Sequence, residues 1–386
     1  MTMKRFTVYA TDPRSRARCG ELITEHGSVQ TPAFMPVGTR GCVKGILPQQ
    51  LKQTGAEMML ANTYHLLLRP GVEIVESLGG LHRFTGWNGP ILTDSGGYQI
   101  FSLSSLNRVG EDGVEFASHI DGSPIMLDAP SATTIQNRLG ADIIMCFDEC
   151  TPYPCPLNQL EKAVERTIRW AEMCRQAHRN PKQMLFGIVQ GGTHLPLRRR
   201  CTEALTAMDF DGYAIGGLSV GEGHEAMVET TSFTAPLLPQ ERPRYLMGVG
   251  MPADIVAAVR EGIDLFDCVL PSRNGRNAFA FTENGPIRLR NSRWAQDLEP
   301  IEKDCPCPAC QTFTRAAIRH FFNVGEMLGP ILATIHNLTY YQRLMSRIRQ
   351  TIRDGLFEEW SCLFIEKHKK ETQMDLLESQ ERKECS

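Results

Sequence analysis

The stretch Met184-Leu185-Phe186-Gly187-Ile188-Val189 is a continuous run of apolar residues, and it ends at the triplet Gln190-Gly191-Gly192. Because the run shows no alternation of apolar and polar residues, it predicts a strand that is buried on both faces, as in a parallel sheet. The triplet places a polar side chain and two glycines at the carboxyl end of that strand. In parallel α/β folds this end of the sheet carries the functional residues.

The same pattern recurs along the chain, with helical patterns between several copies. Apolar periodicity predicts helices over 158–179, 195–208 and 253–262, and alternating strands and helices indicate an α/β fold. A doubly wound open sheet also fits, but the number of runs and the lack of a G-x-G-x-x-G fingerprint favour a (β/α)8 TIM barrel. The other apolar runs cover 58–60, 90–93, 142–147, 212–215, 244–247 and 265–269.

Composition is that of a soluble globular protein. The 386 residues are 42% hydrophobic and 22% charged, which excludes collagen, a coiled coil and wholesale disorder. No apolar run approaches about 18 residues, so we expect no membrane span, and residues 1–6 do not resemble a signal peptide. We therefore expect a cytoplasmic protein. In a reducing compartment, clusters among the 13 cysteines indicate metal binding or catalysis rather than disulfides.

Charge is unevenly distributed along the chain. The net charge is −3, yet residues 271–350 contain 11 Lys and Arg against 6 Asp and Glu. Such a basic segment is typical of a polyanion site, although from charge alone a solvated helix face is the favoured interpretation.

The last third of the chain predicts a different organisation. Residues 313–328 and 331–354 have long helical patterns, separated near Gly329-Pro330. We expect a single barrel domain over 1–386, with a zinc-binding subdomain at 291–350 inserted near the C-terminus.

The strongest local motif is Cys305-Pro306-Cys307-Pro308-Ala309-Cys310, followed by His336. Three thiolates and one imidazole complete a tetrahedral structural zinc site with no open position. His320 is a rival fourth ligand, since its distance from Cys310 is closer to common zinc-finger spacings. The alternative without a metal is a set of buried or free cysteines and a chance histidine.

Three carboxylates lie at the ends of predicted strands: Asp94, Asp148 and Asp267. A carboxylate can attack a sugar C1′ or act as a general acid or base, whereas any single one can equally be a helix cap or a loop residue. Because all three are predicted to lie on one face of the barrel, a catalytic role is favoured over three unrelated cap or loop residues. Asp267 is the most unusual, because apolar residues flank it on both sides and a carboxylate there needs a partner or a task.

Other residues near these strand ends suit a planar, hydrogen-bonding ligand. Gly96-Gly97 and Gly216-Gly217 permit close backbone approach, and Gln190 or the Gly217 backbone can read the edge of a heterocycle. Tyr98 can stack on a base or be an ordinary core tyrosine. Arg273 and Arg276 can hold phosphates or be loop charges.

Six blocks of sequence, together with the cysteine motif, carry a resemblance to a known family. They are Leu92-Thr93-Asp94-Ser95-Gly96-Gly97-Tyr98-Gln99, Ser118-His119-Ile120-Asp121-Gly122, Phe147-Asp148-Glu149-Cys150-Thr151-Pro152-Tyr153-Pro154, Asp211-Gly212-Tyr213-Ala214-Ile215-Gly216-Gly217-Leu218, Tyr245-Leu246-Met247-Gly248-Val249-Gly250 and Phe266-Asp267-Cys268-Val269-Leu270-Pro271. Over nearly its whole length the chain resembles the tRNA-guanine transglycosylases, closest to the bacterial type.

The resemblance implies a zinc-containing (β/α)8 barrel that acts as a homodimer. The implied reaction belongs to queuosine biosynthesis and replaces guanine at position 34 of the tRNA anticodon. The implied substrates are the tRNAs for Asp, Asn, His and Tyr, which share a U-G-U sequence that the enzyme recognises. The incoming 7-deazaguanine is preQ1 in most bacterial members. The zinc ligands that the resemblance implies are Cys305, Cys307, Cys310 and His336, with one structural zinc ion per chain.

The resemblance also implies roles for residues of the barrel. Asp267 is the nucleophile that forms a covalent ester with the tRNA, and Asp94 is the general acid and base. Arg273 and Arg276 contact the anticodon loop. The implied base-binding residues are Asp148, Gln190, Gly217, Leu218, Tyr98, Met247, Ser95 and Cys150.

Several positions depart from one or other branch of the family. Gln190-Gly191-Gly192 resembles the eukaryotic type, whereas Cys150 and Val220 match the bacterial pattern, and Ala278 stands where glycine is commoner. We therefore expect preQ1 and keep queuine as the alternative. Two other functions are alternatives. One is the archaeal type, for whose C-terminal RNA-binding domains we expect the chain to lack room. The other is a non-catalytic partner subunit, against which the three carboxylates argue.

Overall fold

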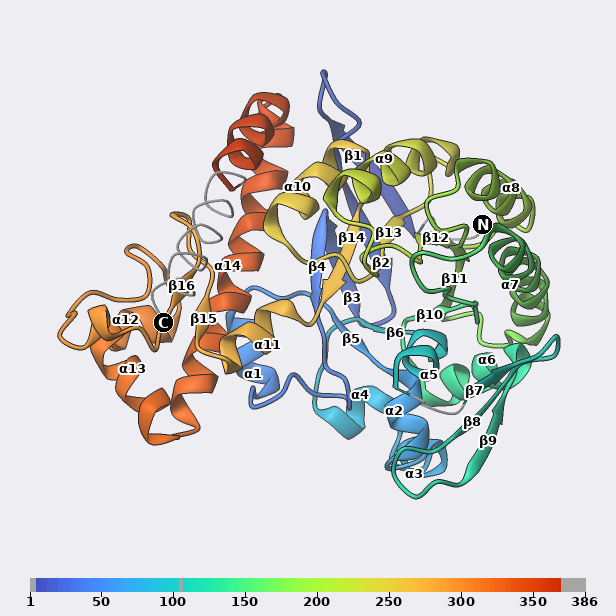
Figure 1. The fold of residues 1–386 in the computed structure, drawn as a ribbon, viewed down its shortest axis with the longest axis horizontal. Coiled ribbons are helices and arrows are strands. Elements are labelled where there is room, and N and C mark those ends of the chain that lie inside the picture. Colours follow the sequence, from blue (N-terminus) through green and yellow to red (C-terminus); the bar gives the residue numbers. More distant parts are fainter. Residues whose placement is uncertain (1–4, 104–106, 369–386) are drawn as a thin grey trace.

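Eight parallel strands form the centre of the computed structural model, which describes residues 5–103 and 107–368 (Figure 1). Around the sheet the order is β4-β14-β13-β12-β11-β10-β6-β5, and a bridge between Val37 and Leu60 joins the two ends. The predicted TIM barrel is therefore confirmed. Its strands are β4 (Ala33–Pro36), β5 (Met59–Ala61), β6 (Ile91–Thr93), β10 (Ile143–Met145), β11 (Met184–Val189), β12 (Gly212–Ile215), β13 (Arg244–Leu246) and β14 (Leu265–Cys268).

Seven of these strands arise from the apolar runs seen in the sequence, and the eighth does not. Strand β4 follows Pro32 and ends at Pro36. Proline cannot donate to a sheet ladder, so this segment reads as a loop in sequence. In the structure it pairs with β14, and Val37, which directly follows it, bridges to Leu60 of β5 and completes the barrel.

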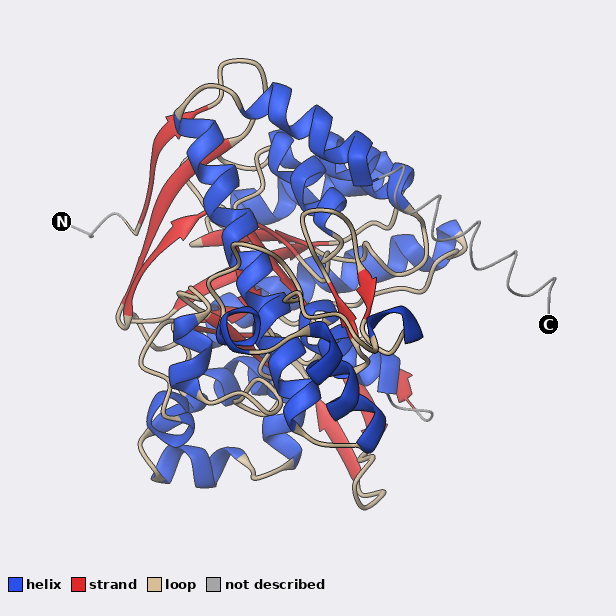
Figure 2. Cartoon of the chain, turned by 90° about the vertical axis from the view of Figure 1, so that its left-hand side faces the viewer, coloured by secondary structure: helices blue, strands red, loops and turns tan. Residues whose placement is uncertain are grey.

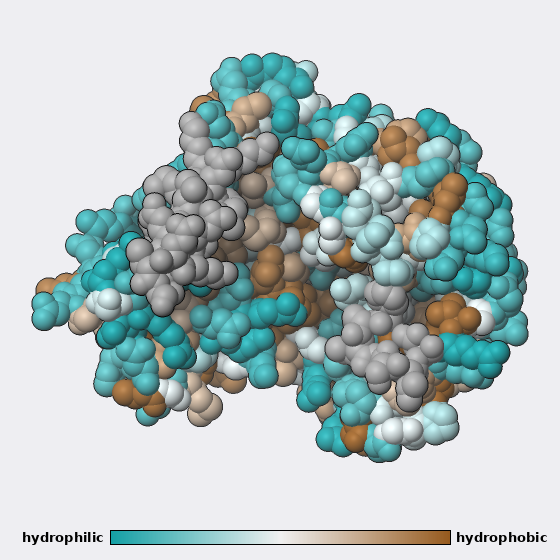
Figure 3. Space-filling view, in the orientation of Figure 1, coloured by the Kyte–Doolittle hydropathy of each residue, from teal (hydrophilic) through white to brown (hydrophobic). Residues whose placement is uncertain are grey.

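Helices surround the barrel, and their outer faces are polar, as Figure 3 shows for α7 and α8 at the right-hand edge. The helices predicted between strands are present as α7 (Leu157–Ala177), α8 (Leu195–Ala207) and α10 (Pro252–Arg260). The others along the barrel are α1 (Pro48–Gln53), α2 (Thr63–Leu68), α3 (Val72–Ser77), α4 (Gly80–Thr85), α5 (Gly97–Leu103), α6 (Ala129–Leu139), α9 (His224–Thr234) and the 3-10 turn η1 (Ala235–Leu237).

Two antiparallel sheets that the sequence pattern did not reveal are added to the barrel. Strands β1 (Phe6–Thr11), β2 (Arg18–Thr24) and β3 (Gly27–Thr31) form a sheet just before β4 (Figure 2). Its Phe6, Leu22 and Val29 pack into one core with the inward side chains of the barrel strands, so this sheet closes the barrel's amino-terminal end. A second sheet, β7 (Asn107–Val109), β8 (Val114–Ala117) and β9 (Pro124–Leu127), follows α5.

An insertion follows the last barrel strand and forms the lobe at the left of Figure 1. The long helix α14 ends this insertion and packs against α11, β4 and the β1–β2 hairpin, so it ties the lobe to the barrel. The insertion consists of α11 (Leu270–Arg276), β15 (Phe279–Ala280), β16 (Ile287–Arg288), η2 (Ser292–Trp294), α12 (Pro308–Thr312), α13 (Arg315–Val324) and α14 (Leu328–Arg353). The subdomain bounds 291–350 stay a prediction.

The break between the two long helices lies earlier than predicted. Helix α13 ends at Gly325, which adopts φ of 79° and caps the helix in the left-handed region. Gly329 and Pro330, expected at the break, lie instead in the first turn of α14. Proline fits there because the first-turn N–H groups have no partner within the helix. In the part of the chain that the structure describes, no helix is long and apolar enough to cross a membrane.

Candidate active site and metal centre

One rim of the barrel collects the polar residues that follow its strands. Asp94 comes directly after β6, Gln190 directly after β11, and Asp267 is the third residue of β14. Asp148 and Gly217 follow β10 and β12 by a few residues. Because all eight strands are parallel, their carboxyl ends share this rim, where TIM barrels carry their active sites.

Asp267 is oriented through one of its two carboxylate oxygens. Tyr245 Oη donates to Asp267 Oδ1 at 2.6 Å, and the Gly248 amide donates to the same oxygen at 2.8 Å. Burial raises the pKa of Asp267, and these two hydrogen bonds oppose the rise. No described residue donates to Oδ2, which leaves this oxygen available to attack an electrophile.

Asp94 is a buried carboxylate directly after β6, which β4 and β5 separate from β14 around the barrel. The Asn62 side-chain amide donates to its Oδ2, and the Thr63 backbone amide donates to its Oδ1 at 2.8 Å. Burial raises the pKa of Asp94 to about 6, and the nearby charge of Asp267 acts in the same direction. A carboxyl group with this pKa can both give and take a proton near neutral pH.

Asp148 lies at the centre of a polar network. Ser95 Oγ donates to Asp148 Oδ1 at 3.1 Å, and Gln190 Nε2 donates to Asp148 Oδ2 at 2.7 Å. Burial raises the pKa of Asp148 to about 6. Asp148 is an acceptor for N–H groups whenever it is ionised.

Two glycines allow the backbone to approach this network. A Cβ on Gly97 would lie 2.8 Å from the Asp148 carbonyl oxygen. A Cβ on Gly217 would lie 2.3 Å from Gln190 Oε1, so a side chain there would displace the Gln190 amide. Gly217 also has φ of 65°, which favours glycine.

The remaining predicted base-site residues lie around the same rim. Leu218 and Cys150 are buried, and Cys150 lines a cavity of about 290 Å³ together with Gly97 and Asp148. Tyr98 is 48% exposed on α5, and Met247 is half-buried just after β13. Their sandwich around a base, one member from each side, stays a prediction.

Helix α11 carries the two arginines predicted to contact RNA. It begins two residues after β14, so Arg273 and Arg276 lie close to the rim. Arg273 is exposed, whereas Arg276 is half-buried. Burial and the charge of Arg273 lower the pKa of Arg276.

Three residues at the site were not predicted from sequence. Asn62 and Thr63 follow the 58–60 run, so the rule that found Asp94 would also have found them. Tyr245 gives no such signal, because it lies inside an apolar run and resembles an ordinary core residue.

The cysteine motif and His336 form a buried cluster in the inserted lobe. His336 Nδ1 lies 3.7 Å from Cys305 Sγ, 3.8 Å from Cys307 Sγ and 3.3 Å from Cys310 Sγ. A tetrahedral zinc ion with ordinary Zn–S and Zn–N bonds separates such atoms by about 3.6 Å. His336 Nε2 lies 2.8 Å from the Phe281 carbonyl oxygen, and donation to it turns Nδ1 toward the sulfurs. The four residues therefore fit a closed structural zinc site.

The alternative ligand His320 is wrong for this cluster. It lies exposed on α13, next to the Phe321 ring, and outside the group of close ligand atoms. Helix α14 instead brings His336 to the cysteines from 26 residues beyond Cys310.

The basic segment 271–350 is only partly an open positive surface. Arg315 pairs with Asp297 at 3.0 Å, and Arg343 pairs with Glu302 and Glu283. These arginines are neutralised within the lobe. Arg273 and Arg276 form no ion pair with any residue in the described ranges, so they are better placed to meet an external anion.

Comparisons with known proteins agree on one family. The model described as "Queuine tRNA-ribosyltransferase" matches residues 12–370. A queuine tRNA-ribosyltransferase of Pelotomaculum thermopropionicum is 52% identical over 363 residues, which cover 94% of this chain and 98% of the relative. One of Nitrosomonas eutropha is 53% identical over 348 residues (90% and 96%), and one of Caldanaerobacter subterraneus is 50% identical over 369 residues (95% and 98%).

Proposed function

Since the chain belongs to the queuine tRNA-ribosyltransferase family, we propose that it is a tRNA-guanine transglycosylase that replaces guanine at position 34 of the anticodon by a 7-deazaguanine. The geometry of two carboxylates supports this reaction. At the rim of the barrel, Asp267 is held through Oδ1 with Oδ2 available, beside the buried Asp94 whose pKa is about 6. This is the pair of groups that a retaining glycosyl exchange requires.

The proposed reaction has two displacements at C1′ of the flipped-out nucleotide. Asp267 Oδ2 attacks C1′ and forms an ester as the C1′–N9 bond breaks, and protonated Asp94 gives its proton to the departing guanine. The incoming base then gives its N9 proton to Asp94, attacks C1′ and releases Asp267. Two inversions retain the configuration of the sugar. Tyr245 and Gly248 stabilise the carboxylate that is regenerated.

The base would be recognised by hydrogen bonds on two edges and by stacking. In the proposal, Asp148 accepts from the N–H groups of the guanine-like ring, supported by Ser95. Gln190 and the Gly217 amide read the other edge of the ring, which bears O6, beside Leu218 and Cys150. Tyr98 and Met247 cover the two faces of the ring. The target base must leave the anticodon stack to reach this pocket, as in other enzymes that act on a base.

The choice of incoming base rests on few residues. Cys150 is buried beside Asp148, and Val220 follows Leu218 in the loop after β12. Both favour preQ1 in the resemblance, with queuine as the alternative. Competition between the two bases for incorporation into tRNA decides between them.

Zinc binding, RNA contacts, oligomeric state and cellular location complete the proposed function. Zinc bound by Cys305, Cys307, Cys310 and His336 would stabilise the inserted lobe without taking part in chemistry. Arg273 and Arg276 would bind phosphates of an anticodon loop that contains U-G-U. We further propose a homodimer that acts in the cytoplasm.

Exchange of labelled guanine into unmodified tRNA tests the function. The protein should incorporate label, Asp267→Ala should incorporate none, and Asp209→Asn, which removes an exposed carboxylate, should behave like the wild type. Absence of exchange by the wild type, or full exchange by Asp267→Ala, would contradict the proposal. Asp267→Asn is a less clean test, because deamidation restores the acid.

A further inference from the structure

A fully buried arginine lies behind the proposed base site. Arg198 belongs to α8, directly beyond the turn Gln190-Gly191-Gly192 that follows β11. Its Nε donates to the Gly192 carbonyl at 2.7 Å, and its Nη1 donates to the Val189 carbonyl at 2.8 Å. The guanidinium thus holds the backbone on both sides of Gln190.

The turn itself is shaped to fit against this arginine. Gly191 and Gly192 have φ of 136° and 53°, values that favour glycine. A Cβ on Gly191 would lie 2.9 Å from the Arg198 backbone nitrogen, so only glycine lets the turn come this close to α8. The Gln190 backbone N–H also donates to Cys201 Sγ at 3.3 Å, about one turn further along the helix.

The guanidinium also reaches the second strand end of the site. Gln190 donates to Asp148, and its Oε1 lies 2.3 Å from the position that a Cβ on Gly217 would take. That same Gly217 position is 3.7 Å from Arg198 Nη2. Arg198 is therefore next to both groups proposed to read one edge of the base.

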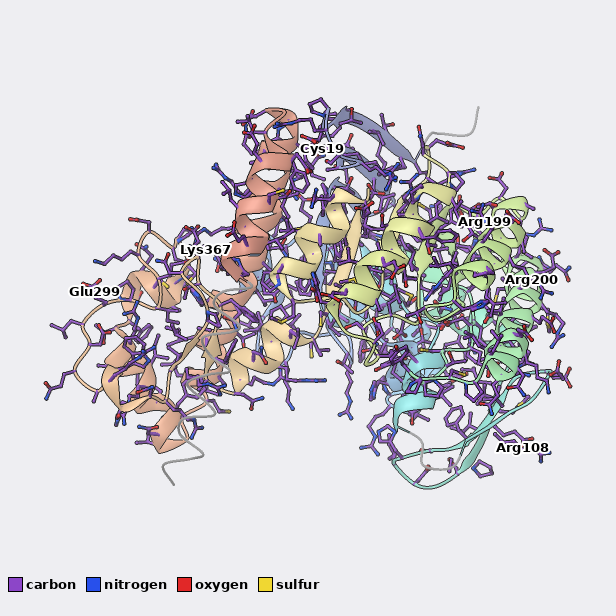
Figure 4. The ribbon with its side chains drawn as sticks, turned by 45° about the horizontal axis from the view of Figure 1, so that its top comes forward. Cys19, Arg108, Arg199, Arg200, Glu299 and Lys367 are labelled. Carbon is purple, nitrogen blue, oxygen red and sulfur yellow. The ribbon has the colours of Figure 1, made fainter. Side chains whose placement is uncertain are left out.

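Arg198 is an unusual residue to bury here. It forms no ion pair with a described carboxylate, and its Nη2 has no hydrogen-bond partner among the described residues. Burying a cation against neutral carbonyls is costly, and an apolar side chain of similar volume would pack the same space without that cost. Arg199 and Arg200, its neighbours in sequence, are instead exposed on α8 (Figure 4).

We propose that Arg198 is a positioning residue for base recognition, which fixes the Gln190 side chain and the Gly217 backbone at the edge of the base that bears the O6 carbonyl. The proposal rests on the transglycosylase function. It assigns to Arg198 the discrimination at O6 and leaves discrimination at the N1 and N2 groups to Asp148.

Two purine analogues separate these edges. 6-Thioguanine keeps the N1 and N2 donors of guanine but replaces O6 by a weaker acceptor, whereas hypoxanthine keeps O6 and lacks the N2 amine. The measurement is kcat/KM for incorporation of guanine and of each analogue into tRNA. It is made on the wild type, Arg198→Met, Arg198→Lys and the control Arg200→Met, whose parent residue pairs with Glu165 on the surface.

In Arg198→Met the preference for guanine over 6-thioguanine should fall about tenfold or more, and the preference over hypoxanthine should stay within about twofold. Arg198→Lys can reach one of the two carbonyls and should recover part of the first preference. Arg200→Met should match the wild type in both.

Loss of both preferences in equal measure, or of neither, would overturn the proposal, because it would show that Arg198 only packs the barrel. If Arg198→Met does not fold, the same two ratios in Arg198→Lys decide. Failure of the wild type to incorporate guanine at all would instead refute the transglycosylase function.

Discussion

Replacing Asp148 by Asn should change how the stability of the protein depends on pH. Burial raises the pKa of Asp148 from 3.8 to about 6, so the folded protein holds the proton of this group more tightly than the unfolded chain does. The stabilising contribution of protonated Asp148 is therefore complete below pH about 4 and is lost as the pH rises through about 6. Asparagine does not titrate and escapes this loss.

The size of the effect follows from the two pKa values. A change from 3.8 to about 6 corresponds to about 3 kcal/mol of folding free energy lost by the wild type over this pH range. All other titrating groups are shared, so they cancel in the comparison. The free energy of unfolding of Asp148→Asn relative to the wild type should therefore rise by roughly 2 kcal/mol between pH about 4 and 7, the greater part of that effect. The difference in unfolding free energy at any single pH also depends on how the new asparagine side chain contacts Ser95 and Gln190, because both of these residues donate hydrogen bonds to Asp148 in the wild type.

Urea unfolding of both proteins at several pH values across this range measures the difference. Asp209→Asn, which removes an exposed carboxylate paired with Arg242, controls for the change in net charge. A constant difference between Asp148→Asn and the wild type across the range would refute the reasoning, since it would mean that folding leaves the pKa of Asp148 where it was.

Three further predictions follow from single contacts. Tyr245→Phe removes the hydroxyl that donates to Asp267 at 2.6 Å, so kcat for guanine exchange should fall about 10- to 100-fold while the protein stays folded; an unchanged kcat would contradict the orienting role. Gly217→Ala places a Cβ 2.3 Å from Gln190 Oε1 and should raise KM for guanine at least about tenfold; wild-type KM would show that the Gln190 amide does not read the base. Cys305→Ser should lower the bound zinc from one equivalent per chain and lower the melting temperature; a full equivalent, measured by metal analysis, would refute the ligand set.

The barrel was predictable because most of its strands are buried on both faces. Such strands appear as continuous apolar runs, and seven of the eight were identified in this way. Strand β4 was missed because Pro32 and Pro36 bound it, and its pairing depends on neighbours far away in the sequence. The β1–β3 sheet, which closes the barrel, was missed as well, since its role becomes visible only when the barrel is assembled.

The candidate site was predictable where a polar residue interrupts or ends an apolar run. Asp94, Gln190 and Asp267 stand out in this way. Tyr245 does not, because a tyrosine in a run resembles core, and Arg198 does not, because three consecutive arginines resemble a solvated helix face. Only the fold shows that one arginine of the three is buried behind the turn that holds Gln190.

The fourth ligand of the metal cluster shows a similar limit. The spacing of Cys305, Cys307 and Cys310 is local, so the sequence predicts their association directly. The choice between His320 and His336 depends on how α13 and α14 pack, which the spacing of the residues does not determine. In the structure α14 crosses from the lobe to the barrel, and that path places His336 among the cysteines.

We propose above all that Asp267 bonds covalently to tRNA during exchange. The most direct test denatures the protein during turnover with unmodified tRNA, in the absence of an incoming base, and maps the tRNA-linked peptide by mass spectrometry. We predict an adduct on the peptide that contains Asp267, lost in Asp267→Ala and discharged when guanine is added. An adduct on any other residue, or exchange that proceeds while no adduct forms under trapping conditions, would contradict the account.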